Sequence, residues 1–101
     1  LAFGARIAGK IVVDDGCAKA VRKAGGCSNQ PAGITDVEGE FEAGNTISVV
    51  NKNGHELARG LANYSSEELD MIKGAKTSEI ENILGHKHFD EVIHRDDLVI
   101  L

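Results

Sequence analysis

The apolar positions of this 101-residue chain fall mostly in short runs interrupted by polar residues, a pattern typical of β-strands. We predict strands at residues 10–13 (KIVV), 34–41 (ITDVEGEF), 46–50 (TISVV) and 56–62 (ELARGLA), and a closing segment with Val92, Ile93, Leu98, Val99 and Ile100 as its apolar residues. Turn signals lie between the runs, at residues 31–33 (PAG) and 43–45 (AGN). Asn53 and Gly54 predict a hairpin because both residue types accept positive φ, and Gly39 predicts a bend within its strand.

Residues 17–24 (CAKAVRKA) follow a helical spacing instead. Asp14 or Asp15 would cap this helix through a carboxylate oxygen, and Gly25 with Gly26 would end it. The spacing directs one set of side chains to the core, namely Cys17, Ala20, Val21 and Ala24. The opposite set, Lys19, Arg22 and Lys23, makes the outer face basic.

Two further short helices are predicted by Ser-x-x-Glu capping boxes. Ser65 with Glu68 opens the first, which ends near Gly74, and Ser78 with Glu81 opens the second, which ends at Gly85. These helices interrupt the strands without alternating with them, so the order excludes a Rossmann unit. We therefore predict one domain over residues 1–101, mainly β with short helices, folded as a small mixed barrel-like sheet.

The charge of the chain is uneven. The net charge of −5 argues against strong nonspecific nucleic-acid binding, because Lys and Arg supply most of that affinity. However, residues 1–34 hold five basic and two acidic residues, whereas the remainder holds six basic and fourteen acidic ones. Any polyanion would have to dock on the N-terminal third. Charge runs most often serve solubility, so solvated faces are the favoured interpretation.

Several other classes of protein are disfavoured. No apolar run approaches the roughly 18 residues that span a bilayer. The first ten residues lack the pattern of a secretory signal, and without an initiator Met the chain looks cut from a longer one. We expect Cys17 and Cys27 to be reduced thiols of a cytoplasmic protein, with a disulfide between them as the less favoured alternative.

Ordered motifs along almost the whole chain resemble the C-terminal PUA domains of glutamate 5-kinases. The segment KIVVDDGCAKAV resembles the family's strand followed by D-x-G-A, with Cys17 in place of Ala. VEGEF resembles V-x-G-x-F, and residues 58–66 (ARGLANYSS) resemble A-R-G-L-x-x-Y-S-S. Residues 28–34 (SNQPAGI) resemble S-L-L-P-x-G-I, although Asn29 and Gln30 replace two leucines and remove apolar surface from this loop.

The resemblance implies a PUA-type mixed β pseudo-barrel whose kinase domain is absent from this chain. ATP and Mg²⁺ would belong to that domain, and this chain would carry no catalytic residue and no cofactor. No G-x-x-x-x-G-K-[ST] phosphate loop is present. In the wider PUA family the first helix, the loop after it and an adjacent strand grip RNA. The matching positions here are Lys19, Arg22, Lys23, Ser28 and Gly33.

Two hypotheses for the function stay open. One is recognition of structured RNA, with Lys and Arg on phosphates and the backbone near Gly33 approaching closely. No aromatic residue joins the basic helix as a stacking platform, which weighs against it. The other is contact with the parent kinase domain or a neighbouring subunit that tunes assembly or feedback regulation. No membrane partner is expected.

Two constellations are set aside. His86, His88, Asp90 and His94 have metal-ligand chemistry, but they follow a helix end and enter a strand, so we expect no metal site. His94 would instead form a buried or edge hydrogen bond and Arg95 an ion pair. Ser65, His94 and Asp97 supply the residue types of a hydrolase triad, yet no G-x-S-x-G elbow is present and Ser65 already serves as a helix cap.

Overall fold

A computed structural model describes residues 6–24, 31–87, 89, 91–93, 99 and 100, and only the main chain of residues 20 and 22–24. The strands are β1 (Gly9–Val13), β2 (Ile34–Gly39), β3 (Thr46–Val50), β4 (Glu56–Leu61) and β5 (Val99–Ile100). The helices are α1 (Asp15–Ala24), α2 (Ser66–Ile72) and α3 (Ile80–Leu84), with 3₁₀ turns at Pro31–Gly33 and Thr77–Glu79.

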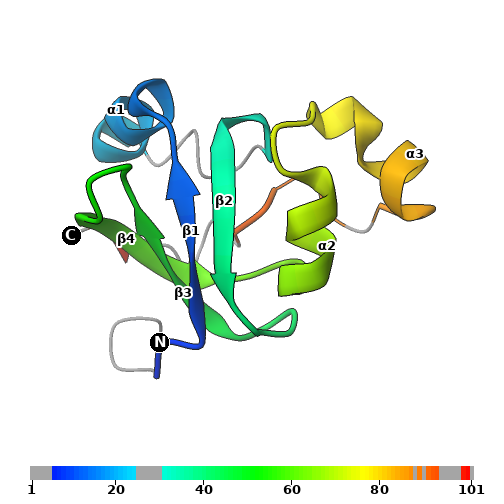
Figure 1. Cartoon of the computed structure of the whole chain (residues 1–101), viewed down its shortest axis with the longest axis horizontal. Coiled ribbons are helices and arrows are strands. Elements are labelled where there is room, and N and C mark those ends of the chain that lie inside the picture. Colours follow the sequence, from blue (N-terminus) through cyan, green and yellow to red (C-terminus); the bar gives the residue numbers. More distant parts are fainter. Residues whose placement is uncertain (1–5, 25–30, 88, 90, 94–98, 101) are drawn as a thin grey trace.

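The strands form one mixed sheet in the order β2-β1-β3-β4-β5. β1 and β3 are parallel, with Gly9 opposite Ile47, and every other neighbouring pair is antiparallel. Beyond β4, Ala62 forms an isolated bridge with Ile93. The predicted mixed sheet with short helices is confirmed. Figure 1 shows α1 and the pair α2 and α3 on opposite sides of β1 and β2.

The core is assembled from the alternating positions of the strands and one face of each helix. β3 is the most buried strand, because all five of its residues are at most 6% exposed. Its inward residues Ile47 and Val49 are completely buried. The remaining fully buried aliphatic residues include Ile11, Val13, Val21, Leu69, Ile72, Ile80, Val92 and Ile93. Burial of a side chain of this size contributes about 1.5–3 kcal/mol, so these residues fix the positions of the helices on the sheet.

The first predicted helix start is confirmed. The Asp14 carboxylate accepts a hydrogen bond from the Cys17 amide at 2.7 Å, which satisfies a donor that the first turn leaves unpaired. Cys17 and Val21 are buried, as their spacing predicts. Gly25, Gly26 and Cys27 lie outside the described residues.

One of the two predicted capping boxes is correct. Ser65 accepts from the Glu68 amide at 3.2 Å, and Glu68 accepts from the Ser65 amide at 2.9 Å, at the start of α2. The second prediction is wrong. Ser78 lies inside a 3₁₀ turn, and the residue with the extended backbone of a cap is Lys76 (φ −74°, ψ 151°). The predicted end of the following helix is confirmed, since Gly85 has the left-handed conformation (φ 83°).

The predicted hairpin joins β3 and β4, but with a different geometry from the expected one. Gly54 has positive φ (86°), whereas none of the described non-glycine residues does, so Asn53 does not share that role. The side chain of Asn51 shapes the turn instead. Its Oδ1 accepts from the amides of Asn53 at 2.9 Å and His55 at 3.0 Å. An Asx turn of this kind holds the tip in one conformation.

Candidate nucleic-acid interface

The outer face of α1 is the surface on which the sequence places most of its candidate RNA contacts. The buried Cys17 and Val21 turn the opposite face of the helix to the core, and Lys19 is exposed. Arg22 and Lys23 belong to α1 by their main chain, and their spacing of three and four residues from Lys19 puts them on the same helix face. The structure therefore brings the main chains of these three residues together on one helix.

The other two candidate positions differ from this group. Gly33 is buried at the end of its 3₁₀ turn, and its carbonyl oxygen accepts from the Asp14 amide at 3.0 Å. This bond ties the segment after the helix to the helix start. Gly33 thus supports α1 through its main chain. Ser28 lies outside the described residues.

A further cation, Lys52, lies beside α1 and was not found from the sequence. Its Nζ is 3.0 Å from Oδ2 of Asp15, and both side chains are about two-thirds exposed (65% and 66%). The contact places the tip of the β3–β4 hairpin against the first turn of α1. No sequence signal links the two residues, because the hairpin reaches α1 only through the pairing of the strands.

Arg59, the arginine of the A-R-G-L motif, is held in an internal pair. Its Nε and Nη2 donate to the two carboxylate oxygens of Glu56 at 2.8 and 3.0 Å. Ser48 also donates to this carboxylate, at 2.6 Å. The hydrogen bond from Arg59 is the main reason why the pKa of Glu56 is lowered, and burial opposes the shift. Because the Nε–Nη2 edge of its guanidinium is occupied by Glu56, Arg59 has a structural role in this conformation.

Acidic side chains gather on the other side of the molecule. Glu38, at the end of β2, and Glu67 and Asp70, on α2, are exposed, and so are Glu40 and Glu42 in the segment between β2 and β3. Figure 1 shows α2 on the far side of β2 from α1. The acidic residues of α2 are therefore separated in space from α1, and two of the carboxylates are paired, Glu38 with Lys10 at 3.7 Å and Asp70 with Lys73 at 2.6 Å.

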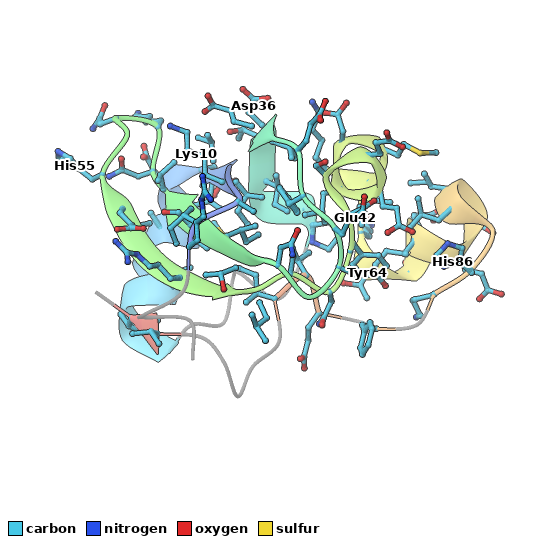
Figure 2. All side chains as sticks on the ribbon, turned by 90° about the horizontal axis from the view of Figure 1, so that it is seen from below. Lys10, Asp36, Glu42, His55, Tyr64 and His86 are labelled. Carbon is cyan, nitrogen blue, oxygen red and sulfur yellow. The ribbon has the colours of Figure 1, made fainter. Side chains whose placement is uncertain are left out.

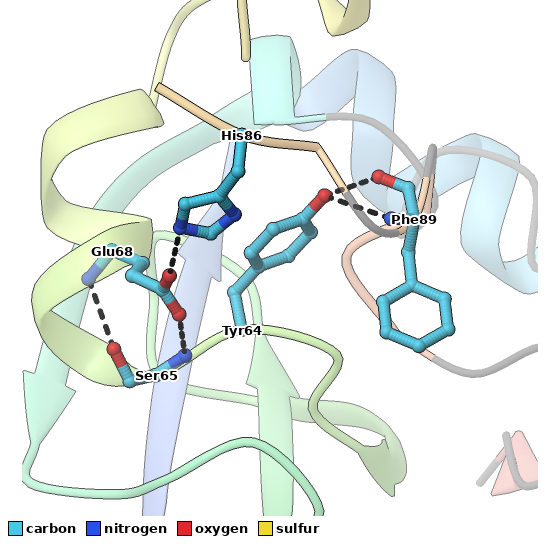
Figure 3. Close-up of polar contacts among 5 residues, drawn as sticks. All are labelled: Tyr64, Ser65, Glu68, His86 and Phe89. Atoms are coloured by element: carbon cyan, nitrogen blue, oxygen red, sulfur yellow. Dashed lines mark hydrogen bonds and ion pairs between the residues drawn. The ribbon is translucent and has the colours of Figure 1, made fainter. Parts of the chain in front are cut away.

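The candidate metal and hydrolase groups gain no support. Within the described part of the chain, no group of three or more His, Cys, Asp or Glu side chains could hold a metal ion. His86 lies with its Nε2 3.2 Å from Oε2 of Glu68, the same carboxylate that caps α2 (Figure 3). His88, Asp90, His94, Arg95 and Asp97 lie outside the described residues. None of the described helices has the length and apolar character to cross a membrane.

A second surface feature, apolar in character, lies around Phe89. A groove of about 310 Å³ is lined by Ala43, Gly44, Leu61, Ala62, Asn63 and Phe89, and we call it the Phe89 groove. The Phe89 side chain is 45% exposed. Figure 2 shows His55, near the hairpin tip, at one end of the molecule and His86 at the other, with Tyr64, next to the groove residue Asn63, between them. The groove was not anticipated from the sequence, because its residues come from three separate segments.

The model of the PUA domain family matches residues 9–84, from β1 to the end of α3. This chain belongs to the PUA domain family. Among solved structures, a PUA domain from Aeropyrum pernix K1, crystallised as a tartrate complex, superposes with a TM-score of 0.63 at 23% identity, over 87% of this chain and 43% of that one. The archaeal box H/ACA sRNP Nop10–Cbf5 complex contains a similar fold, with a TM-score of 0.56 at 17% identity, over 92% of this chain and 23% of that one. These two likenesses confirm the PUA fold.

Curated relatives of this PUA domain are glutamate 5-kinases. The enzyme of Thermoanaerobacter sp. (strain X514) is 52% identical over all 101 residues, which cover 27% of its length. That of Caldanaerobacter subterraneus subsp. tengcongensis is 54% identical over the same 101 residues and the same 27%. The chain thus spans about a quarter of these relatives, and the resemblance inferred from its motifs is confirmed.

Proposed function

We propose that this PUA domain is the accessory binding domain of a glutamate 5-kinase and that it binds structured RNA through the outer face of α1. ATP-dependent phosphorylation of L-glutamate, the first step of proline biosynthesis, would be carried out by a kinase domain outside these residues. That domain would also hold ATP and Mg²⁺. The identity of about 50% to glutamate 5-kinases over the full chain supports this parentage.

The arrangement of α1 is the observation that carries the RNA hypothesis. The Asp14 cap and the buried Cys17 and Val21 fix the helix, so its main chain needs no rearrangement to present the exposed Lys19 to solvent. Lys19 is exposed, and Arg22 and Lys23 follow at helical spacing. Cations on a fixed surface contact phosphates and position the nucleic acid. Further support comes from a protein of the same fold that is part of an sRNP.

A salt titration of binding to a structured RNA tests this proposal. The triple variant Lys19→Ala, Arg22→Ala, Lys23→Ala is compared with a control, Lys73→Ala, Lys76→Ala, Lys87→Ala, which removes the same charge from the segment that carries α2 and α3. We expect affinity to fall with salt. In the first variant the slope of log K against log salt should decrease by about 1 for each phosphate that is no longer neutralised, and in the control it should stay unchanged. An equal decrease in both variants, or no binding at low salt, would reject the α1 surface.

A second candidate function is contact with the kinase domain or a neighbouring subunit, tuning assembly or feedback regulation. The exposed Phe89 groove favours it, because apolar surface held open to solvent often marks a protein contact. Deletion of this domain from the full-length enzyme would then alter its sedimentation coefficient or its inhibition by the pathway product. Unchanged assembly and unchanged inhibition would reject this function.

A further inference from the structure

The Phe89 groove is lined by an exposed aromatic side chain and by several small residues. Phe89 stands 45% exposed at one side, and Leu61 of β4 is partly exposed at another. The lining also includes Ala43, Gly44 and Ala62, whose small size leaves the space open. A Cβ atom added to Gly44 would meet no atom within 4 Å. A hollow of this shape and size accepts one or two apolar side chains from a partner.

The position of the Phe89 ring is set by a buried residue. The Tyr64 hydroxyl donates to the Phe89 carbonyl oxygen and accepts from the Phe89 amide at 3.2 Å (Figure 3). Tyr64 is only 2% exposed. The main chain that carries Phe89 is therefore anchored to the core while its ring faces outward, so a partner need not order it on binding. Preorganisation of this kind lowers the entropic cost of association.

The main chain of the other groove residues is also held by hydrogen bonds. The Gly44 amide donates to the Ala62 carbonyl at 2.8 Å, and the Ala62 amide donates to the Asn45 carbonyl at 2.9 Å. The main-chain amide of Asn63 donates to the Val92 carbonyl oxygen at 2.8 Å. These hydrogen bonds connect the turn before β3, the end of β4 and the segment near Phe89. The groove is consequently a built feature of the fold rather than a gap between loose segments.

The charge near the groove and the small number of its lining residues indicate which kind of occupant it fits. Two residues adjoining the lining are acidic: Glu42 precedes Ala43 in the chain, and the main-chain carbonyl of Glu91 accepts from the Asn63 side chain at 2.9 Å. Negative charge near the groove would disfavour a nucleic acid. A stable complex of two free proteins needs about 20–30 residues on each side. The groove offers six. A segment tethered to the domain needs far less contact area, because its effective concentration reaches the millimolar range.

We propose that the Phe89 groove seats apolar side chains from the remainder of the same polypeptide, the part of a glutamate 5-kinase that lies outside these residues. This inference rests on the proposed parentage. The chain covers only 27% of the relatives it matches, so a tethered neighbour more than twice its size would be at hand in such a protein. The groove would then hold the two parts of the enzyme in a defined orientation, leaving the α1 face free.

Site-specific photo-crosslinking in the full-length protein tests the proposal. The photoreactive residue is introduced by Phe89→p-benzoylphenylalanine, an aromatic replacement, and on the other side of the groove by Ala43→p-benzoylphenylalanine. Met71→p-benzoylphenylalanine is the control, since Met71 is 58% exposed on α2 and does not line the groove. A mixture of isotopically labelled and unlabelled protein distinguishes crosslinks within one molecule from those between two.

We expect positions 89 and 43 to crosslink, within one molecule, to peptides outside residues 1–101, and position 71 not to do so. Crosslinks between two copies, or a yield at position 89 no higher than at position 71, would overturn the inference. A gene that encodes no more than these residues would overturn it too. Glutamate phosphorylation by the same samples separates the two proposals, since an active kinase without groove crosslinks rejects only the docking site. Groove crosslinks in a protein without kinase activity reject only the parentage.

Discussion

Tyr64 holds the main chain of Phe89 through both hydrogen-bonding functions of its hydroxyl group. It donates to the carbonyl oxygen and accepts from the amide, while the two rings meet edge to face with centroids 6.4 Å apart and an interplanar angle of 90°. Tyr64, which is 2% exposed, thereby fixes the position of Phe89, which is 45% exposed. The A-R-G-L-x-x-Y-S-S motif contains the buried partner of this pair, so its tyrosine serves the surface as well as the core.

Removal of the Tyr64 hydroxyl should loosen the Phe89 segment. Tyr64→Phe keeps the ring but leaves the Phe89 amide and carbonyl without this partner, and we expect a decrease of about 1–3 kcal/mol in the free energy of unfolding. Urea unfolding measures the decrease, and crosslinking from position 89 should fall in the same variant. Phe89→Ala is the comparison, because truncation of a half-exposed ring keeps both main-chain bonds. An equal decrease in the two variants would contradict this assignment.

The two Ser-x-x-Glu segments should respond differently to the same change. Ser65→Ala removes the cap of α2 and should cost about 1 kcal/mol, within the usual range of about 0.5–2 kcal/mol. Ser78→Ala removes no cap, since Ser78 is exposed within its 3₁₀ turn, and should stay within about 0.5 kcal/mol of the wild type. Parallel urea denaturation of the two variants provides the test. A larger effect for Ser78→Ala would mean that the second capping box exists after all.

Two glycines should show opposite tolerance of a methyl group. A Cβ on Gly9 would lie 2.6 Å from a ring carbon of the buried Phe41 and 2.7 Å from the Glu38 carbonyl oxygen. Gly9→Ala should therefore destabilise the protein by about 1–3 kcal/mol. A Cβ on Gly16, in the first turn of α1, would come no closer than 3.6 Å to Asp14. Gly16→Ala should leave thermal stability unchanged or raise it by up to about 1 kcal/mol. Equal melting temperatures for both variants would refute the tight packing at Gly9.

Acid should weaken the protein partly through Glu56. The hydrogen bond from Arg59 lowers the pKa of Glu56 below its ordinary value of 4.5, so the folded state favours the ionised carboxylate. The stabilisation is complete above that value and is lost as the pH falls from it through the lowered pKa of the folded state. Its size is below about 1 kcal/mol, because both side chains are more than a quarter exposed. Stability curves from about pH 6 to about pH 2 should fall less steeply for Glu56→Gln than for the wild type, and parallel curves would argue against this contribution.

Local signals predicted local structure well. The apolar run of residues 46–50 gave the bounds of β3, the Ser65–Glu68 pair gave the start of α2, and Gly85 gave the end of α3, because each depends on neighbouring residues. The pattern at Ser78 failed for a physical reason. A cap requires an extended backbone, and the residue with that backbone is Lys76, two residues before Ser78, so Ser78 already lies within the 3₁₀ turn that precedes α3.

Long-range relationships could not be predicted from the pattern of residues. The parallel pairing of β1 with β3, the approach of Lys52 to Asp15 and the anchoring of Phe89 by Tyr64 each join segments that are distant in the chain. Helical spacing alone predicted Lys19, Arg22 and Lys23 on one helix, whereas the burial of Gly33 became apparent only in the fold. The residue pattern therefore predicted the helix of the candidate site, and only the fold showed how distant segments meet it.

The central place of β3 in the sheet has a consequence for how the domain folds. Its antiparallel neighbour β4 follows after a short turn, so the hairpin closes a small loop at little entropic cost. Its parallel neighbour β1 is much more distant in the chain, because α1, β2 and the intervening turns separate Gly9 from Ile47. We expect the hairpin to form early and β1 to join late, so that core mutations at Ile11 mainly accelerate unfolding, while those at Val49 also slow folding. The first strand of the chain is then among the last parts to become native.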